Sequence, residues 1–254
     1  MILYKYYGFG SGKIALESER VGFRSPKDFN DPFEVSVIED NSFTGDYIDG
    51  VSKGVAILSL TRTPFNPLMW AHYGDNHSGF VIGYEVETPF FQCEKSNLIP
   101  VQKGNVIYTK TKPYKKTSSD SIVNLCAAIE GLSDEQDNKT RELIDHLFLN
   151  KDTIWCYEEE VRIVKGTVNW AMETQELLEN PYNKYEDKKN IPGLKIYDHQ
   201  IEIKEVYLGA RNPDVSDIST LEYLNKFREK GAKIYSVYVE KESWNLSGNL
   251  IKTE

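Results

Sequence analysis

A helix signal enclosed between two apolar runs, within residues 55–87, is the feature that most constrains the fold. Residues 55–61, VAILSLT, predict a buried strand, and residues 79–84, GFVIGY, predict a second strand rich in β-forming residues. The segment between them supplies an N-cap, a proline for the first helical position and a stop glycine, at Asn66, Pro67 and Gly74. We therefore expect a buried strand, a short helix and a second buried strand in succession.

The same stretch is rich in side chains that can bind a ligand or take part in catalysis. They are Ser59, Thr61, Arg62, Trp70, His72, Tyr73, Asp75, Asn76 and His77. An ordinary strand–helix–strand connection needs few of these, so we interpret the stretch as the floor of a binding site. The alternative is that His72 and Tyr73 are polar core groups whose hydrogen bonds are satisfied internally.

Composition disfavours several classes of protein. With 254 residues, 40% hydrophobic and 27% charged, the chain can bury a sizeable core, and we expect one α+β domain over residues 1–254. The net charge of −9 disfavours general binding of nucleic-acid phosphates. No apolar run reaches the roughly 20 residues of a membrane span. The N-terminal sequence MILYKYYGFG does not resemble a signal peptide, so we expect a cytoplasmic protein.

Hydrophobic periodicity predicts the remaining elements. Strands are expected at residues 1–7, 21–24, 98–108, 201–208 and 234–239. Helices are expected at residues 13–19, 118–131, 133–150 and 214–230, the second and third forming a helical insertion at about 115–152. Capping boxes are expected at Ser133 with Gln136 and at Ser219 with Glu222.

Other segments are expected to be irregular. Gly8, Gly10 and Gly12 are expected to break the chain, and residues 25–34 to form a loop pinned by Phe29 and Phe33. Residues 180–193 read as a polar loop, and the tail after Trp244 as frayed. The cysteines, at Cys93, Cys126 and Cys156, are odd in number and far apart, and are expected to be core residues.

A second candidate site lies in residues 155–164, WCYEEEVRIV. If this segment is a strand, Glu158 and Glu160 point to the same side, and Arg162 follows them. Two carboxylates on one face can orient a hydroxyl group or stabilise a cationic transition state. The alternative is a solvated edge strand with a local ion pair. The apolar residues around the carboxylates favour a cleft.

Four separated motifs resemble a widespread bacterial family known only as a domain of unknown function, family 2971. They are LYKY at the start, FNDPFE at residues 29–34, LMWAHYGDNHSGF at residues 68–80 and YEEEVRI at residues 157–163. The order of the motifs agrees with that family over most of the chain. The family implies no activity.

A more distant resemblance is to the ADP-ribosyltransferases. Their layout is similar: an early strand with an NAD-contacting residue, here Lys5 or Tyr6, then Ser59-Leu60-Thr61, then a late Glu-x-Glu, here Glu158 and Glu160. This resemblance implies a bent split β-sandwich that holds NAD. It also implies that Glu160 holds the nicotinamide ribose, that Glu158 orients the acceptor, and that Tyr73 or Tyr6 stacks on nicotinamide. Arg62 or Arg24 would meet a pyrophosphate oxygen.

The resulting hypothesis is an NAD-dependent ADP-ribosyltransferase-like enzyme whose acceptor is unspecified, a bacterial toxin or a phage-defence effector. Its candidate catalytic residues are Glu158, Glu160, Tyr73 and His72. Its candidate NAD-binding residues are Lys5, Tyr6, Asn30, Asp31, Ser59, Thr61, Arg62 and Arg162. The expected partner is a small-molecule nucleotide.

Two other functions stay open from the sequence. One is a non-catalytic module that binds a nucleotide or regulates another protein. The other is a metal-dependent hydrolase, because His72, Asp75 and His77 together with Glu158 or Glu160 carry metal-binding groups. Against the hydrolase, His72 and His77 are five residues apart across a glycine, which is not a familiar ligand spacing.

Overall fold

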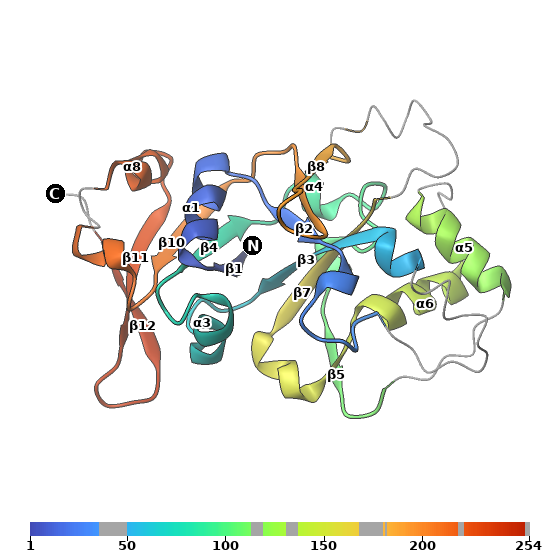
Figure 1. Ribbon diagram of the computed structural model, residues 1–254, viewed down its shortest axis with the longest axis horizontal. Helices are drawn as coiled ribbons and strands as arrows, with labels where there is room; N and C mark the ends of the chain where they lie inside the picture. Colours follow the sequence, from blue (N-terminus) through green and yellow to red (C-terminus); the bar gives the residue numbers. More distant parts are fainter. Residues whose placement is uncertain are drawn as a thin grey trace.

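A computed structural model describes residues 1–35, 50–112, 119–130, 137–167, 180, 182–217 and 221–251. The chain forms one domain of mixed helices and strands around a large open sheet of ten strands, most of them antiparallel (Figure 1). In spatial order the strands are β12 (Leu246–Leu250), β11 (Lys233–Val239), β10 (Ile203–Leu208), β4 (Phe80–Glu85), β1 (Ile2–Tyr7), β3 (Val55–Thr61), β2 (Gly22–Arg24), β9 (Leu194–Tyr197) and β8 (Tyr185–Asp187). The tenth strand, β7 (Glu160–Gly166), pairs with β3 along its whole length.

The sheet is split where β1 meets β3. Strand β1 pairs with β4 over all six of its residues but with β3 only at Tyr4 and Thr61. Further along the same edge of β3, β2 also pairs with it at a single position, Arg24 with Ile57. Because β1 and β3 diverge after one pair, side chains from both strands can face a common gap.

Helices cover both faces of the sheet. One face packs against α1 (Phe9–Ser18), α4 (Pro89–Gln92) and α8 (Glu222–Glu229), whose apolar residues join the largest core cluster. On the other face, α3 (Pro67–Tyr73) covers the β1–β4 part, and α5 (Ser119–Ile129) and α6 (Asn138–Phe148) cover the β3–β7 part. The core cluster beneath α3 and the core cluster beneath α5 and α6 lie on either side of the split.

Short elements complete the fold. They are the 3₁₀ helices η1 (Pro26–Asp28), η2 (Val101–Lys103), η3 (Thr153–Glu158) and η4 (Pro213–Asp217), and a two-stranded parallel sheet of β5 (Ile107–Thr109) and β6 (Asn150–Asp152). Strand β6 leads directly into η3, and η3 leads into β7. This continuous segment therefore brings Lys151, Glu158 and Glu160 to one end of β7.

The central prediction of a strand, a capped helix and a strand is confirmed. The Asn66 side chain accepts hydrogen bonds from Leu68 N (2.9 Å) and Met69 N (3.2 Å), Pro67 begins α3 and Gly74 ends it. Its core-facing residues, Met69 and Trp70, pack on β1 and β4. The expected α+β class is confirmed in its coarse form, whereas the bent split sandwich of the transferases stays a prediction.

Several predicted boundaries are wrong. Gly10 and Gly12 lie inside α1 instead of breaking the chain, because the missing Cβ of Gly12 lets the helix pack on Phe80, whose ring would lie 2.5 Å from that atom. Residues 98–108 form η2 and only the start of β5, since their pairing with β7 is limited to isolated bridges. The tail is not frayed: β12 pairs with β11 over five positions.

Three helix and loop predictions also need correction. Helix α6 begins at Asn138 and is capped by Asp137, whose side chain accepts from Thr140 N; the predicted box at Ser133 and Gln136 lies outside the described residues. Predicted helix 214–230 is divided into η4 and α8, and Ser219 also lies outside the described residues. The predicted polar loop contains β8 and runs up to β9, and the Phe33 side chain is 72% exposed, whereas Phe29 packs against the core cluster of α5 and α6.

Within the described ranges, no helix combines the length and apolar character needed to cross a bilayer. Cys93 and Cys126 are half-buried, but Cys156 is exposed, so the prediction that the cysteines are core residues is wrong for Cys156.

Replacing Asn66 tests how α3 is held. Asn66→Ala removes the cap of α3 and the bond from Asn66 Nδ2 to Tyr157 O (2.7 Å), which ties α3 to η3. We expect the free energy of unfolding in urea to fall by about 1–3 kcal/mol. The control Leu68→Ala, on an exposed position of the same helix, should change it by less than about 0.5 kcal/mol. Equal effects of the two variants would contradict the capping role.

Candidate functional site

A cavity of about 460 Å³ lies at the split between β1 and β3. Its walls come from β1, β2, β3, α3, the loop after η1, β6 and the η3–β7 junction. The volume is within the range of small-molecule sites.

The cavity brings together most of the residues predicted from the sequence. Among its lining residues are Lys5, Tyr6, Asn30, Ser59, Thr61, His72, Tyr73, Glu158 and Glu160. Three predicted residues do not line it: Asp31, Arg62 and Arg162. The match between a linear prediction and one cavity is explained by the split, which exposes β1 and β3 side chains to the same space.

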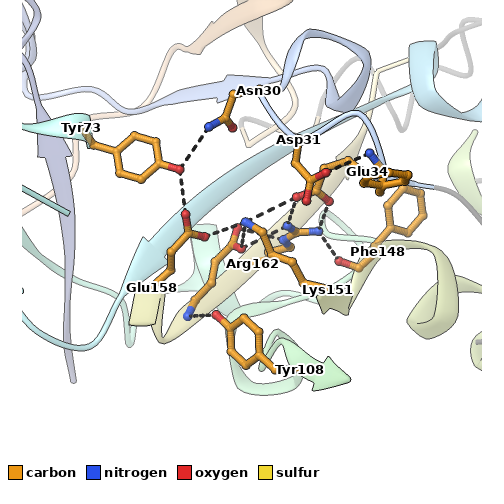
Figure 2. Close-up of polar contacts among 11 residues, drawn as sticks. Asn30, Asp31, Glu34, Tyr73, Tyr108, Phe148, Lys151, Glu158 and Arg162 are labelled. Carbon is orange, nitrogen blue, oxygen red and sulfur yellow. Dashed lines mark hydrogen bonds and ion pairs between the residues drawn. The ribbon is translucent and has the colours of Figure 1, made fainter. Parts of the chain in front are cut away.

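A buried ionic cluster forms the carboxylate end of this cavity. Lys151 Nζ lies 2.6 Å from Glu158 Oε2, 3.1 Å from Glu160 Oε2 and 3.5 Å from Glu34 Oε1. Figure 2 shows this ammonium group among the carboxylates, with Tyr73 on the far side of Glu158. Tyr73 donates a hydrogen bond to Glu158 Oε1 at 2.7 Å and accepts one from Asn30 Nδ2 at 3.4 Å.

Arg162 holds the carboxylates of this cluster from the protein interior. It is fully buried and donates to Glu160 through Nε (2.9 Å) and Nη2 (3.1 Å), and to Glu34 through Nη1 (2.8 Å) and Nη2 (2.6 Å). Its remaining N–H donates to Phe148 O at the end of α6 (2.8 Å; Figure 2). All five guanidinium donors are therefore used within the protein, and Arg162 supports the site without facing the cavity.

The two cavity carboxylates have different protonation behaviour. Burial raises the pKa of Glu158 and outweighs its contacts with Lys151 and Tyr73. Burial alone would also raise the pKa of Glu160, but Arg162 and Lys151 outweigh it and hold that pKa at about 2. Paired groups whose pKa values are pushed apart can divide acid–base and charge-stabilising roles. Glu158 is thus suited to proton transfer, and Glu160 to a permanent negative charge.

Two cations also line the cavity, Lys5 and Arg24. Lys5 Nζ reaches across the split to donate to Ser59 O (3.2 Å), and burial lowers its pKa to about 8. Arg24 is exposed and lines the cavity, and its side chain has no hydrogen-bond or ion-pair partner in the described part of the chain. Lys5 is electrostatically coupled to both Arg24 and Glu160, so it lies between the cationic and anionic parts.

Strand β3 contributes hydroxyl groups to the floor. The Ser59 hydroxyl contributes to holding the pKa of Glu160 down. Thr61, at 2% exposure, lines the cavity, and its Oγ1 has no hydrogen-bond partner among the described residues. A buried hydroxyl group without a partner costs free energy that a bound polar group could recover.

The structure corrects three details of the predicted site. Glu158 is not on the strand: it ends η3, and Glu159 has a left-handed conformation (φ 45°), so β7 begins only at Glu160. Arg62 lies outside the cavity, where it donates to Glu159 O and Asn105 Oδ1. Asp31 lies in a neighbouring cavity of about 220 Å³, which shares Lys151 with the first.

The residues predicted for a metal-dependent hydrolase do not form a metal site in the described part of the chain. Among the described residues, no group of three or more His, Cys, Asp or Glu side chains is placed to hold a metal ion. The His77 ring instead stacks on Trp70 with an interplanar angle of 11°. His72 remains at the cavity.

Sequence reasoning missed three residues of the ionic cluster and its surroundings. Lys151 gave no signal, because it stands in an ordinary polar segment before η3. Glu34 was visible only as part of the FNDPFE motif, and Tyr108, whose hydroxyl accepts from Glu160 N (2.9 Å), came from a segment predicted as plain strand. Only the folded chain brings these residues beside Glu160.

Residues 69–163 match a family described as "Protein of unknown function (DUF2971)". This confirms the predicted resemblance to that family for the segment from α3 to the middle of β7. The match includes His72, Tyr73, Lys151, Glu158 and Glu160, which form one side of the cavity. No curated protein and no solved structure gives a significant match.

Replacing Arg162 tests the ionic cluster. Arg162→Met leaves Glu34 and Glu160 buried without their main partner, and we expect a loss of about 3–5 kcal/mol in the free energy of unfolding at pH 7. The loss should shrink toward pH 4, where the orphaned carboxylates can take up protons. Arg20→Met, which breaks a surface pair with Asp198, should cost at most about 1 kcal/mol. A loss that does not change with pH would contradict this account.

The pKa of Lys5 predicts a second pH effect. Its folded-state pKa of about 8 lies below the ordinary 10.5, so the folded protein releases this proton more readily than the unfolded chain. The contribution of Lys5 to stability therefore rises with pH between 8 and 10.5. We expect Lys5→Met to be more stable than wild type at pH 7, with an advantage that declines up to pH 10.5. An advantage that is constant over this interval would contradict the lowered pKa.

Proposed function

We propose that the protein is an NAD-dependent ADP-ribosyltransferase-like enzyme, and that the cavity at the split binds NAD. The observation that carries this proposal is the distribution of charge in one cavity. Arg24, whose side chain has no hydrogen-bond or ion-pair partner among the described residues, and the poorly solvated Lys5 line the same cavity as Glu158 and Glu160, and Lys5 interacts electrostatically with both Arg24 and Glu160. A dinucleotide has the complementary arrangement: an anionic pyrophosphate and a ribose that becomes cationic during bond cleavage.

Binding would use groups that the protein leaves unsatisfied. Arg24 can form a bidentate contact with a pyrophosphate oxygen pair, and Lys5 adds a second positive charge nearby. The free Thr61 hydroxyl offers a hydrogen bond on the floor, next to Glu160 in the adjacent strand. Tyr73 lies beside Glu158, where its ring can contact the nicotinamide.

The two glutamates then have separate roles. Cleavage of the bond between nicotinamide and ribose sends the bonding electrons to nicotinamide and leaves an oxocarbenium ion. Glu160, kept ionised by Arg162 and Lys151, would stabilise that positive charge. Glu158, with its raised pKa, would take the proton from the attacking acceptor. Lys151 holds both carboxylates in position.

This arrangement also supports catalysis over simple nucleotide binding. A non-catalytic module has no need for a carboxylate with a raised pKa beside a permanently ionised one. A role as a toxin or in defence against phage is a biological context for such an activity, and the residues do not require it.

The proposal is tested by thermal unfolding with and without NAD, together with nicotinamide release. NAD at about 100 times its dissociation constant adds about 2.7 kcal/mol, a rise of about 5–10 °C in Tm for a domain of this size. We expect the rise in wild type and in Glu158→Gln, and about 100-fold slower nicotinamide release in Glu158→Gln.

The matched variants Arg24→Met and Arg62→Met distinguish NAD binding in the cavity from NAD binding at the surface. Both remove one positive charge, but only Arg24 lines the cavity. The Tm rise should be lost in Arg24→Met and kept in Arg62→Met. An equal rise in both variants, or no rise in wild type, would show that NAD does not occupy this cavity. A rise without nicotinamide release would favour a nucleotide-binding module.

A further inference from the structure

In the described part of the chain, the large sheet ends at three strands, which are β8, β7 and β12. Strand β8 has only three residues, and two of these are carboxylates, Glu186 and Asp187. They form ion pairs with Lys188 and Lys195 (2.6 and 2.7 Å). A short strand with charged side chains is a poor template for pairing with another chain, so the β8 edge is protected.

The outer edge of β7 is covered by the chain itself. Residues 99–106 run along it, and Glu160, Arg162 and Val164 of β7 form backbone hydrogen bonds with this segment at 2.8–3.2 Å. These bonds use the N–H and C=O groups that another strand would need. The β7 edge is therefore closed as well.

Strand β12 has neither kind of protection. It pairs with β11 without a register shift, and its sequence, LSGNL, contains no charged residue and no proline. No other strand of the described residues pairs with it. Figure 1 shows the β11–β12 hairpin at one end of the molecule, opposite to the end that carries α5 and α6. Natural sheets usually block such an edge, so an unprotected one indicates a partner strand.

The free backbone groups of β12 follow from its ladder with β11. At the two ends of β12, Asn245 and Ile251 form backbone hydrogen bonds with the other arm of the hairpin (3.1 and 2.9 Å). Alternate residues of an antiparallel strand point their N–H and C=O groups to opposite sides. The odd-numbered residues therefore bond to β11. The N–H and C=O groups of Leu246, Gly248 and Leu250 point to the open edge, where no described residue meets them.

We infer that β12 pairs with β12 of a second copy of this chain, in antiparallel orientation about a twofold axis at Gly248. This inference does not rest on the proposed function. The edge reads apolar, polar, glycine, polar, apolar, so a half-turn about Gly248 places like residues opposite like. Leu246 lies opposite Leu250 of the second copy, and Ser247 lies opposite Asn249. In this register every outward N–H and C=O group of the edge gains a partner.

The side chains of the hairpin agree with a covered edge. Val239, Trp244 and Leu250 are 64%, 98% and 47% exposed, although all are large and apolar. Leu250 lies on the same face of β12 as Leu246, which is buried in the core cluster beneath α3. Pairing of the two copies would place Leu250 beside Leu246 of the other copy, and would extend that core cluster across the axis.

The occupant is a second copy because the strand is complementary to itself. A strand of an unrelated protein would not require matching residues on both sides of Gly248. The net charge of −9 opposes association of two copies, but β12 brings no charged side chain to the axis. Screening of this repulsion by salt should therefore strengthen the dimer.

Pairing at β12 leaves the cavity of each copy open. Strands β11, β10 and β4 separate β12 from β1 in the sheet, and the cavity lies beyond them at the split between β1 and β3. The dimer would thus carry two cavities, and the ten-stranded sheet of one copy would continue into that of the other.

Sedimentation velocity across a concentration series tests the inference. We expect wild type to exchange between monomer and dimer, with a dissociation constant that falls as sodium chloride is raised. Leu250→Lys puts a charge against Leu246 of the second copy, and should raise this constant at least about tenfold. Ile191→Lys is the matched control, because Ile191 is 45% exposed between β8 and β9, at the other end of the sheet. It should leave the constant unchanged.

A second variant tests the backbone pairing. Leu250→Pro removes an N–H that points to the open edge and keeps the bonds between β11 and β12. It should sediment as a monomer while its circular dichroism spectrum stays that of wild type. Wild type that is monomeric at every concentration would overturn the inference. A dimer of equal affinity in wild type, Leu250→Lys and Leu250→Pro would place the contact elsewhere and would also overturn it, as would equal weakening in Ile191→Lys and Leu250→Lys.

Discussion

The interaction on which the site depends is the enclosure of the Arg162 guanidinium. Its five donors reach Glu160 on its own strand, Glu34 in the N-terminal loop and Phe148 O at the end of α6. Glu34, 128 residues from Arg162 in the sequence, and Phe148, 14 residues from it, are therefore tied to one buried charge. Because an unpaired buried charge is so costly, these contacts are made together, and they fix where Glu160 stands in the cavity.

Lys151 is a second cation that holds carboxylates in place, and it does so at the cavity surface. Three carboxylates against two cations leave this cluster with one net negative charge when all are ionised. Arg162 and Lys151 keep Glu160 ionised, while burial makes Glu158 easier to protonate. Two neighbouring glutamates in one sequence motif thus acquire different chemistry from their surroundings alone. The split between β1 and β3 then provides the space in which both can act on a ligand.

The split also explains why the site is polar at its floor. A continuous sheet would bury Ser59 and Thr61 against another strand or a helix, whereas here they face a cavity. Lys5 can cross the gap to Ser59 O for the same reason. Beside this floor, η3 is held against α3 by the bond between Asn66 and Tyr157. The cavity and its carboxylates are consequences of one arrangement of short segments around β3 and β7.

The sequence by itself determined the local elements with strong signals: the strands at 55–61 and 80–85, and the helix capped at Asn66. It also determined which residue types were candidates, because hydroxyls and carboxylates at strand ends are visible in linear order. Only the tertiary structure decided that Arg24, and not Arg62, faces the cavity, that Glu158 leaves the strand, and that Lys151 joins the two glutamates. The physical reason is range: capping and periodicity act within a few residues, whereas burial and ion pairing depend on chain segments that meet only after folding.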